Sequence, residues 1–512
     1  MKTRIRLVRD TYVDSVLQLA GTRAMREQPG VDWAAAAMAT PANLGTLREE
    51  GFADGELTGA SANDLVLAVR ADADDTLDEA LAAADTAMFA AREPAGGEQR
   101  DRPPRTLERA LAGQPGTTTA IISVPGDYAA LEAHKALSAG LDVLLFSDNV
   151  PVEQEVELKE RATGLGRLVM GPGAGTAMLG GTCLGFANVV RPGRVGVLAA
   201  AGTGAQEAMS LLDRWGAGVS AVIGLGGRDL TDAVDGRMAK LALRRLREDP
   251  GTDAMLLVSK PPAPRVAREV VAAAGDATLV ASLIGLSGDA GLPSSVPVSR
   301  TLEGGVLRTL EALGLPLPDV VGDLPARVEA ALARLDESRT LVRGLFSGGT
   351  LCYESLVILS GVLGPVYSNT PLDPALRVPE PAGSSVCLDL GEEEYTRGRP
   401  HPMIDPEARI ELLREQGKDD RVAAILLDVV IGHGAHADPA GQLAPACEEV
   451  HRNGGPQVVA YCLGTEHDPQ GFAAQRRRLA DAGCIVTETA ARASLAAAAL
   501  ARRDPKIVHT RL

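Results

Sequence analysis

Two short segments of this 512-residue chain combine glycine with threonine in a way that suits the binding of a small oxyanion. One strand-like run ends at Gly202-Thr203-Gly204, and another ends at Gly348-Gly349-Thr350. In both, glutamate follows the threonine after three residues, and an apolar helical pattern continues from there. Glycines let the backbone approach an anion, and the first turn of a helix presents free N–H groups. We expect both turns to bind phosphate or a similar anion through amides and threonine hydroxyls.

A tight strand-to-helix turn with threonine as its N-cap would use the same residues. Repetition at corresponding places favours binding over this purely structural reading. Neither turn has the GxxxxGK[ST] spacing of a P-loop, and that motif is absent from the chain. Inorganic phosphate, an acyl phosphate or a carboxylate is therefore a better candidate than a nucleoside triphosphate.

The elements around the turns form an internal repeat of strands and helices. Leu225-Gly226-Gly227 after the first turn parallels Leu390-Gly391-Glu392 after the second. Alternating strand and helix patterns predict an α/β protein of several domains with parallel, doubly wound sheets. The expected parts are a small N-terminal α/β domain at 1–92, a Pro- and Gly-rich linker at 93–107, a Rossmann-like domain at 108–192, and the two repeats at 193–335 and 336–512.

Charge and composition exclude several classes of partner. The chain has 67 acidic and 51 basic residues, a net charge of -16, which opposes binding to nucleic acid or an anionic membrane. We find neither an apolar leader at the start nor an apolar run of about 18 residues. The six cysteines form no CxxC pair, as expected for reduced residues of a cytoplasmic protein.

Three further residues have the chemistry of an anion-handling site. Lys260 follows the strand-like run AMLLVS. Arg399 can hold a planar carboxylate through two hydrogen bonds, and His401 can exchange a proton with a leaving nitrogen. An alternative for this Pro-stiffened loop is a structural Arg–Asp pair with a turn histidine. His433 and His436 lack an evident further ligand, so we predict no metal site.

Longer motifs show resemblance to two related families. Residues 121–284 are similar to the succinyl-CoA synthetase α-subunit through LVMGPGAGTAMLGGT, VGVLAAAGTGAQE and VIGLGG. The whole chain resembles the FdrA proteins through ISVPGDYAALEA, LLFSDNV, GLGGRDL, SKPPA, FSGGTL, YTRGRPHPMIDP, LLDVVIG and GTEHDPQ. This resemblance implies one Rossmann-like and two flavodoxin-like units of the succinyl-CoA-synthetase type.

The sequence departs from the synthetase pattern at the residues that bind coenzyme A and carry the phosphohistidine in that family. The family's Gly-rich coenzyme A loop is replaced by the 1–92 domain and the linker. Its phosphohistidine lies in a Gly-His-Ala-Gly loop, whereas residues 286–296 contain no histidine. The glutamate that orients that histidine aligns with Lys260, so the resemblance implies a cation that contacts an anion directly at this place. His467 lies in the corresponding loop of the second repeat, but its neighbours do not match the pattern, and we do not assign phosphorylation to it.

Some FdrA proteins resemble the first subunit of a three-subunit oxamate carbamoyltransferase, which interconverts oxalurate and phosphate with oxamate and carbamoyl phosphate. The resemblance therefore implies a carbamoyltransferase subunit with small anionic substrates and hetero-oligomeric partner subunits. An alternative is an acyl-CoA synthetase, with coenzyme A as cofactor and the nucleotide bound by a partner. Another alternative is a non-catalytic scaffold that binds an anion. We assign no cofactor outside the synthetase reading.

Overall fold

The computed structural model describes residues 1–13, 15–52, 54–89, 104–286, 288, 291–396 and 399–512. The chain forms two compact units. One contains residues 1–103 and 393–400, and the other contains residues 104–392 and 401–512. Most of the predicted linker at 93–107 lies outside the described residues.

The first unit is built on a three-stranded antiparallel sheet, ordered β1-β3-β2. Alternate residues of β1 have different partners: Ile5 and Leu7 pack into an apolar cluster, while Arg4 and Arg6 pair with aspartates of α4. The period of two along the strand explains this division. The elements of this unit are β1 (Lys2–Val8), α1 (Ser15–Arg26), β2 (Val31–Met38), α2 (Pro41–Glu49), α3 (Asp54–Leu57), β3 (Leu65–Ala71) and α4 (Asp74–Phe89).

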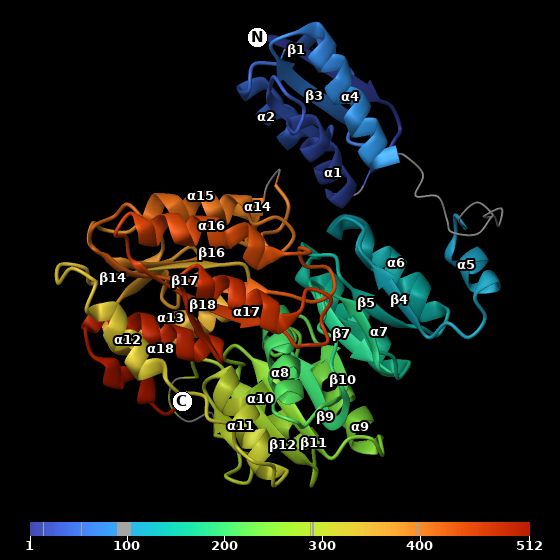
Figure 1. Cartoon of the computed structure of the whole chain (residues 1–512). Helices are drawn as coiled ribbons and strands as arrows, with labels where there is room; N and C mark the ends of the chain where they lie inside the picture. Colours follow the sequence, from blue (N-terminus) through green and yellow to red (C-terminus); the bar gives the residue numbers. More distant parts are fainter. Residues whose placement is uncertain (14, 53, 90–103, 287, 289–290, 397–398) are drawn as a thin grey trace. The chain divides into compact units, whose positions relative to one another are not determined.

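The second unit begins with a small parallel sheet ordered β4-β5-β6 (Figure 1). Lys159 on α7 is fully buried and joins this part to the next sheet, because its Nζ donates to Glu155, Asp229 and the carbonyl of Leu225 at 2.8, 2.9 and 2.9 Å. The elements are α5 (Leu107–Gly113), β4 (Thr119–Ile122), α6 (Gly126–Ser138), β5 (Asp142–Leu145), α7 (Val152–Gly164) and β6 (Val169–Met170).

A seven-stranded sheet follows, ordered β13-β12-β11-β9-β10-β7-β8. Its parallel part has the flavodoxin-like order 2-1-3-4-5, counting from β9. An antiparallel hairpin, β7 and β8, extends its edge. The elements are β7 (Thr176–Leu179), β8 (Thr182–Gly185), β9 (Pro192–Ala199), α8 (Gly202–Arg214), β10 (Val219–Gly224), α9 (Arg237–Glu248), β11 (Ala254–Ser259), α10 (Pro264–Ala273), β12 (Thr278–Leu283), β13 (Val298–Ser299), α11 (Leu302–Ala312) and α12 (Leu324–Leu332).

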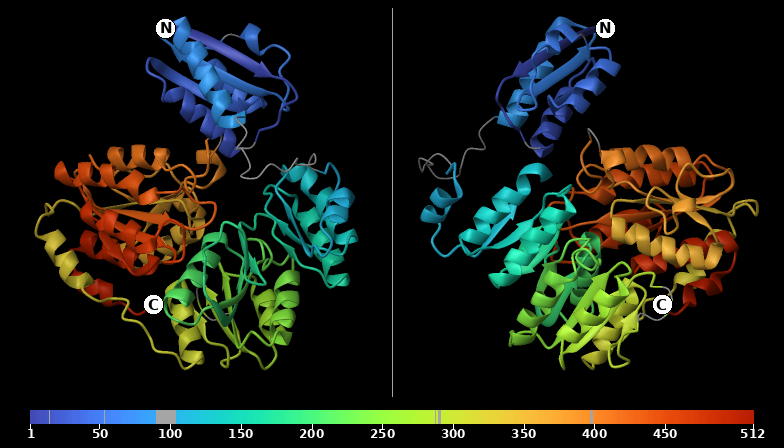
Figure 2. Two further views of the ribbon diagram at one scale, coloured as in Figure 1. Left: turned by 45° about the vertical axis from the view of Figure 1, so that its right-hand side comes forward. Right: turned by 180° about the vertical axis from the view of Figure 1, so that it is seen from behind.

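The last sheet is entirely parallel and has the order β15-β16-β14-β17-β18-β19. Helices lie on both faces of this sheet and of the preceding one (Figure 2). The elements are β14 (Leu341–Phe346), α13 (Gly349–Leu363), β15 (Val366–Ser368), η1 (Pro374–Leu376), β16 (Ser385–Asp389), α14 (Glu393–Thr396), α15 (Glu407–Gln416), β17 (Val422–Val430), α16 (Pro439–Arg452), β18 (Gln457–Leu463), α17 (Phe472–Asp481), β19 (Ile485–Thr487), α18 (Ala490–Arg502) and η2 (Pro505–His509).

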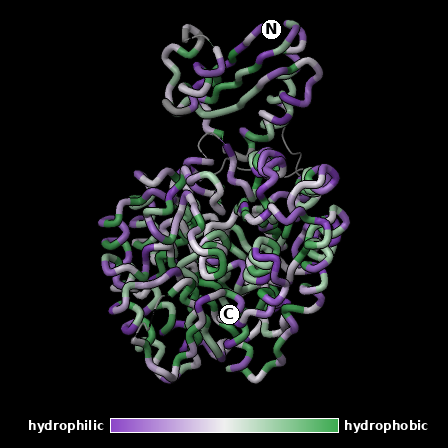
Figure 3. Tube along the Cα trace, turned by 90° about the vertical axis from the view of Figure 1, so that its left-hand side faces the viewer, coloured by the Kyte–Doolittle hydropathy of each residue, from purple (hydrophilic) through white to green (hydrophobic). Residues whose placement is uncertain are grey.

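This topology confirms the predicted α/β class with parallel, doubly wound sheets. Apolar runs become central strands: all nine residues of β17 are buried, and the hydrophobic segments in Figure 3 lie mainly inside. In the first repeat β9 lies between β10 and β11, and in the second β14 lies between β16 and β17, so the connections on the two sides leave in opposite directions. Ligands of open α/β sheets bind at the carboxyl ends of strands at such a switch point. Both glycine-threonine turns occupy this position.

Candidate functional site

The two glycine-threonine turns contact each other in the folded chain. The amide of Thr350 donates a hydrogen bond to Oγ1 of Thr203 over 3.3 Å. A Cβ added to Gly348 would lie 2.8 Å from Cγ2 of Thr203, and one added to Gly204 would lie 3.0 Å from Cγ2 of Thr350. Glycine is thus required here for close packing between the repeats. The folded chain brings the two predicted anion sites into one place.

The first turn retains free hydrogen-bond donors. The first intrahelical bond of α8 runs from the amide of Ala205 to the carbonyl of Ala201 over 3.1 Å. Within the described residues, the amides of Gly202, Thr203 and Gly204 donate no hydrogen bond. A Cβ at Gly202 would meet nothing within 4 Å. This end of α8 therefore has unpaired N–H groups, open space and the positive end of the helix dipole.

At the second turn, a carboxylate of the chain itself already accepts hydrogen bonds from two backbone amides. Asp428 on β17 accepts hydrogen bonds from the amides of Ser347 and Gly348 over 2.8 and 2.7 Å. Arg409 on α15 pairs with the same carboxylate at 3.1 Å. The amide of Gly348 is consequently engaged, whereas that of Gly349 donates no hydrogen bond within the described residues. The duplicated turns are alike in sequence but differ in the donors they offer.

Lys260 and Asp389 each lie close to a residue in the first part of α13. Lys260, exposed after β11, places Nζ 4.8 Å from the ring centroid of Tyr353. Asp389 ends β16 and is 5% exposed, and its Oδ2 would lie 2.4 Å from a Cβ on Gly349. Burial raises the pKa of this carboxyl to about 7, against the opposing effect of the Gly391 amide and Lys260. A carboxyl with this pKa can exchange protons near neutral pH.

Sequence reasoning missed Asp389, although the repeat contained a signal for it. Parallel pairing makes Asp389 the counterpart of Gly224: Gly224 ends β10 beside β9, and Asp389 ends β16 beside β14. Comparison of the two repeats at this position would have identified it.

His401 lies near the second turn, as its assignment to the site requires. Its Nε2 would be 2.7 Å from a Cβ on Gly391, and its Nδ1 accepts a hydrogen bond from the amide of Met403 over 3.2 Å. Burial lowers the pKa of this imidazole to about 4. Because Nδ1 is an acceptor, the neutral ring carries its proton on Nε2 and can donate a hydrogen bond there. This tautomer is not a nucleophile at Nε2.

Arg399 is exposed and belongs to the unit of residues 1–103 and 393–400, whereas Lys260, His401 and both turns belong to the other unit. The predicted roles of Lys260, Arg399 and His401, and of the glycines and threonines of the turns, remain predictions.

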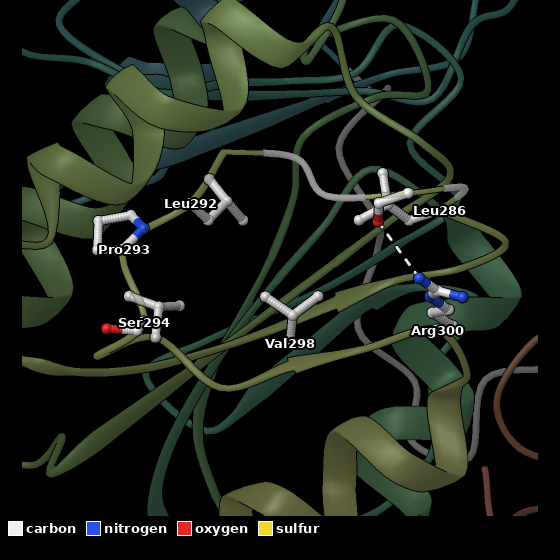
Figure 4. A pocket seen from close by; sticks show the side chains of 8 residues that line it. Leu286, Leu292, Pro293, Ser294, Val298 and Arg300 are labelled. Carbon is white, nitrogen blue, oxygen red and sulfur yellow. Dashed lines mark hydrogen bonds between the residues drawn. The ribbon is translucent and has the colours of Figure 1, made fainter.

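A pocket of about 340 Å³ is lined by residues before β13, by Val298 of β13 itself and by Arg300 directly after it (Figure 4). Its lining includes Leu286, Leu292, Val298 and Arg300. Arg300 donates to the carbonyl of Gly288 over 3.2 Å. The lining contains neither turn, so this pocket is separate from the candidate site.

The start of α6 does not fit a coenzyme A cradle. A Cβ on Gly126 would lie 2.4 Å from the carbonyl oxygen of Asp148 and 2.6 Å from that of Asn149. This glycine is explained by packing against the chain. The first turn of α6 also carries Asp127, whose carboxylate would repel a diphosphate. We therefore derive no step through coenzyme A on this chain.

Comparisons with known proteins agree with this architecture. Residues 345–500 match the CoA-ligase family model. The succinate–CoA ligase [ADP-forming] subunit alpha of Methanothermobacter thermautotrophicus is 29% identical over 143 residues, covering 27% of this chain and 47% of that protein. The chain thus spans about half the length of this relative. Fold and matches together define a CoA-ligase-like protein related to the succinyl-CoA synthetase α-subunit.

A relative of nearly equal length places the chain more narrowly. The uncharacterized protein YahF of Escherichia coli (strain K12) is 35% identical over 511 residues, which cover 97% of this chain and 98% of that protein. The chain belongs to the family of YahF. Among solved structures, the dinucleotide forming acetyl-coenzyme A synthetase 1 of Ca. Korarchaeum cryptofilum, in complex with phosphate and ADP, has a TM-score of 0.32 and 16% identity, covering 77% of this chain and 84% of that one.

Residues 1–104 match the model named AllF, heavy metal-associated domain. The residues present do not fit a thiol or imidazole metal site, since the first histidine of the sequence is His134 and the first cysteine is Cys183. No group of three or more metal-ligating side chains occurs in the described part of the chain. Asp438, near His433 and His436, instead caps α16 through the amide of Gly441 at 3.1 Å.

Within the described residues, no helix has the length and apolarity needed to cross a bilayer.

Proposed function

We propose that the protein handles acyl phosphates: it binds phosphate where the two turns meet and exchanges an acyl group between phosphate and a second acceptor. One observation carries this proposal: the start of α8 presents free amides at Gly202, Thr203 and Gly204 beside open space. Lys260, whose Nζ lies over the ring of Tyr353 on α13, supplies a cation. Fixed N–H donors and a cation stabilise the negative charge that develops during acyl transfer.

One specific form of this proposal is an acid–thiol ligase, in which the acyl group passes to the thiol of coenzyme A. The matches to the CoA-ligase model and to a succinate–CoA ligase subunit support it. In this version a partner subunit holds coenzyme A and the nucleotide, because the start of α6 does not fit the coenzyme. This chain would then bind the acyl phosphate and phosphate.

Carbamoyl transfer of the FdrA type is the second version. Two observations favour it: residues 286–296 lack histidine, and the Nδ1 of His401 is occupied by the amide of Met403. Direct attack of phosphate on the carbamoyl carbon of oxalurate needs neither a phosphohistidine nor coenzyme A.

The test begins with phosphate binding to the full chain, measured by isothermal titration calorimetry. We expect saturable binding by one phosphate per chain. The chain with its neighbouring gene products is then given either acetyl phosphate with coenzyme A or oxalurate with phosphate. Thioester formation supports the ligase version, and carbamoyl phosphate supports the carbamoyl version. Absence of phosphate binding would refute the shared proposal.

A further inference from the structure

The two repeated turns have unequal chemical surroundings, although their sequences correspond. Beside the first turn the neighbouring strand β10 ends at Gly224, and beside the second turn the neighbouring strand β16 ends at Asp389. The first turn offers three free amides, while two backbone amides of the second are bound by Asp428. One copy thus suits an anion, and the other places carboxylates beside the same junction.

The carboxyl of Asp389 has one hydrogen-bonded and one unpartnered oxygen. Oδ1 accepts from the amide of Gly391 over 3.0 Å. Oδ2 accepts no hydrogen bond from any described residue, although the side chain is 5% exposed. It lies against Gly349, whose own amide is also free in the described structure. Because Asp389 is 5% exposed as a residue and Oδ2 has no partner in the described structure, this oxygen is available to a ligand or water.

We propose that Asp389 is the proton-transfer residue of this site, and that it serves the acyl group held between the two turns. This inference rests on the proposed function and deepens it. It assigns different tasks to the two copies: α8 binds the phosphate, and the start of α13 with Asp389 moves the proton.

The step balances without any further reactant. A phosphate hydroxyl gives its proton to the Asp389 carboxylate while that phosphate oxygen forms a bond to the acyl carbon. The bond between the acyl carbon and its nitrogen or sulfur leaving atom breaks, and the electron pair goes to that atom. Asp389 then gives the proton to the leaving atom and ends as a carboxylate. Raised to about 7 by burial, its pKa suits both transfers.

The charged and titratable groups that face Asp389 come from several elements. Lys260 lowers its pKa, whereas Asp428 and Glu392 raise it. The pKa of Cys352 on α13 is raised well above 9.0, and the pKa of His401 is lowered to about 4. Neither of these two groups titrates near neutral pH. Glu207 on α8 and Glu354 on α13 also titrate near neutral pH, with pKa values of about 7 and 8. The contribution of Asp389 to the pH response of a bound anion is therefore the part that Asp389→Asn removes.

The first test uses sulfate, whose charge is constant over the pH range of interest, and it does not depend on turnover. Wild type and Asp389→Asn are titrated with sulfate between about pH 5.5 and 8.5. We expect the wild-type dissociation constant to rise about tenfold across this range, because the ionised carboxylate repels the anion. In Asp389→Asn it should change less than about twofold. Equal pH responses in the two proteins would overturn the inference.

The second test measures acyl transfer. We expect Asp389→Asn to lower kcat by about 100-fold or more while sulfate still binds. Asp481→Asn, an exposed aspartate at the end of α17, is the matched control and should retain wild-type rates. Full activity of Asp389→Asn would refute the role of Asp389 and leave the phosphate site intact. Failure of wild type to bind phosphate or sulfate would instead refute the proposed function.

Discussion

The carboxylate of Glu354 accepts a hydrogen bond from the amide of Leu302 over 2.6 Å, although the two residues belong to different repeats. Glu354 lies on α13 of the second repeat, and Leu302 begins α11 of the first. Glu207 makes the reciprocal contact, since it accepts from the amide of Ala490 at the start of α18 and from the hydroxyl of Tyr461 at 2.5 Å. The repeats therefore join by exchanging carboxylate–helix contacts, like the halves of a symmetric dimer.

These glutamates are buried, and burial dominates their protonation. It raises the pKa of Glu207 to about 7 and that of Glu354 to about 8, despite the opposing hydrogen bonds. Because the folded-state pKa exceeds the ordinary value of 4.5, folding favours the protonated form. The stability that this provides is complete below about pH 4.5 and is lost as pH rises through about 8.

Glu354→Gln should remove most of this pH dependence, because the amide keeps an acceptor for Leu302 and carries no charge. At about pH 9 we expect its free energy of unfolding to exceed that of wild type by roughly 2–4 kcal/mol. Urea unfolding of the full chain at several pH values measures this. Glu329→Gln, on the exposed face of α12, is the control, and its free energy of unfolding should depend on pH as that of wild type does. A Glu354→Gln protein that is less stable than wild type at high pH would contradict the prediction.

Thr203→Val should destabilise the junction of the repeats. The substitution removes the Oγ1 that accepts from the Thr350 amide and leaves that donor buried without a partner. We expect the free energy of unfolding to fall by roughly 1–2 kcal/mol in urea melts. Thr350→Val is the matched control and should cost less than half as much, since its hydroxyl makes no side-chain hydrogen bond within the described structure. Equal losses would argue against the role of the Thr203 hydroxyl.

Gly202→Val should block anion binding without harming the fold. A Cβ at Gly202 meets nothing within 4 Å, so the larger side chain fills the open space at the end of α8. We expect phosphate affinity, measured by calorimetry, to fall at least about tenfold, because the anion loses close approach to the amides. Gly361→Val, at another uncrowded position on α13, should bind phosphate normally. Normal binding by Gly202→Val would place the anion elsewhere.

Zinc and copper(I) should not bind tightly to residues 1–104, because this segment lacks cysteine and histidine. Competition titrations of the full chain with chromophoric chelators test this expectation. Cys183→Ser is the control for the one partly exposed thiol. The prediction fails if added metal protects amides of residues 1–89 from hydrogen exchange in this variant.

The amino-acid sequence alone determined the α/β class and the repeated turns, because periodicity and glycine placement are local properties of the chain. It did not determine that the two turns touch, since this depends on packing between sheets that are distant in sequence. Comparison of Asp389 with Gly224 was available in the sequence, but its meaning depends on which strand ends are neighbours. Likewise, the amide of Gly348 donates to Asp428 only because β17 pairs with β14. Local patterns specify elements, whereas tertiary contacts decide which polar groups remain free to act.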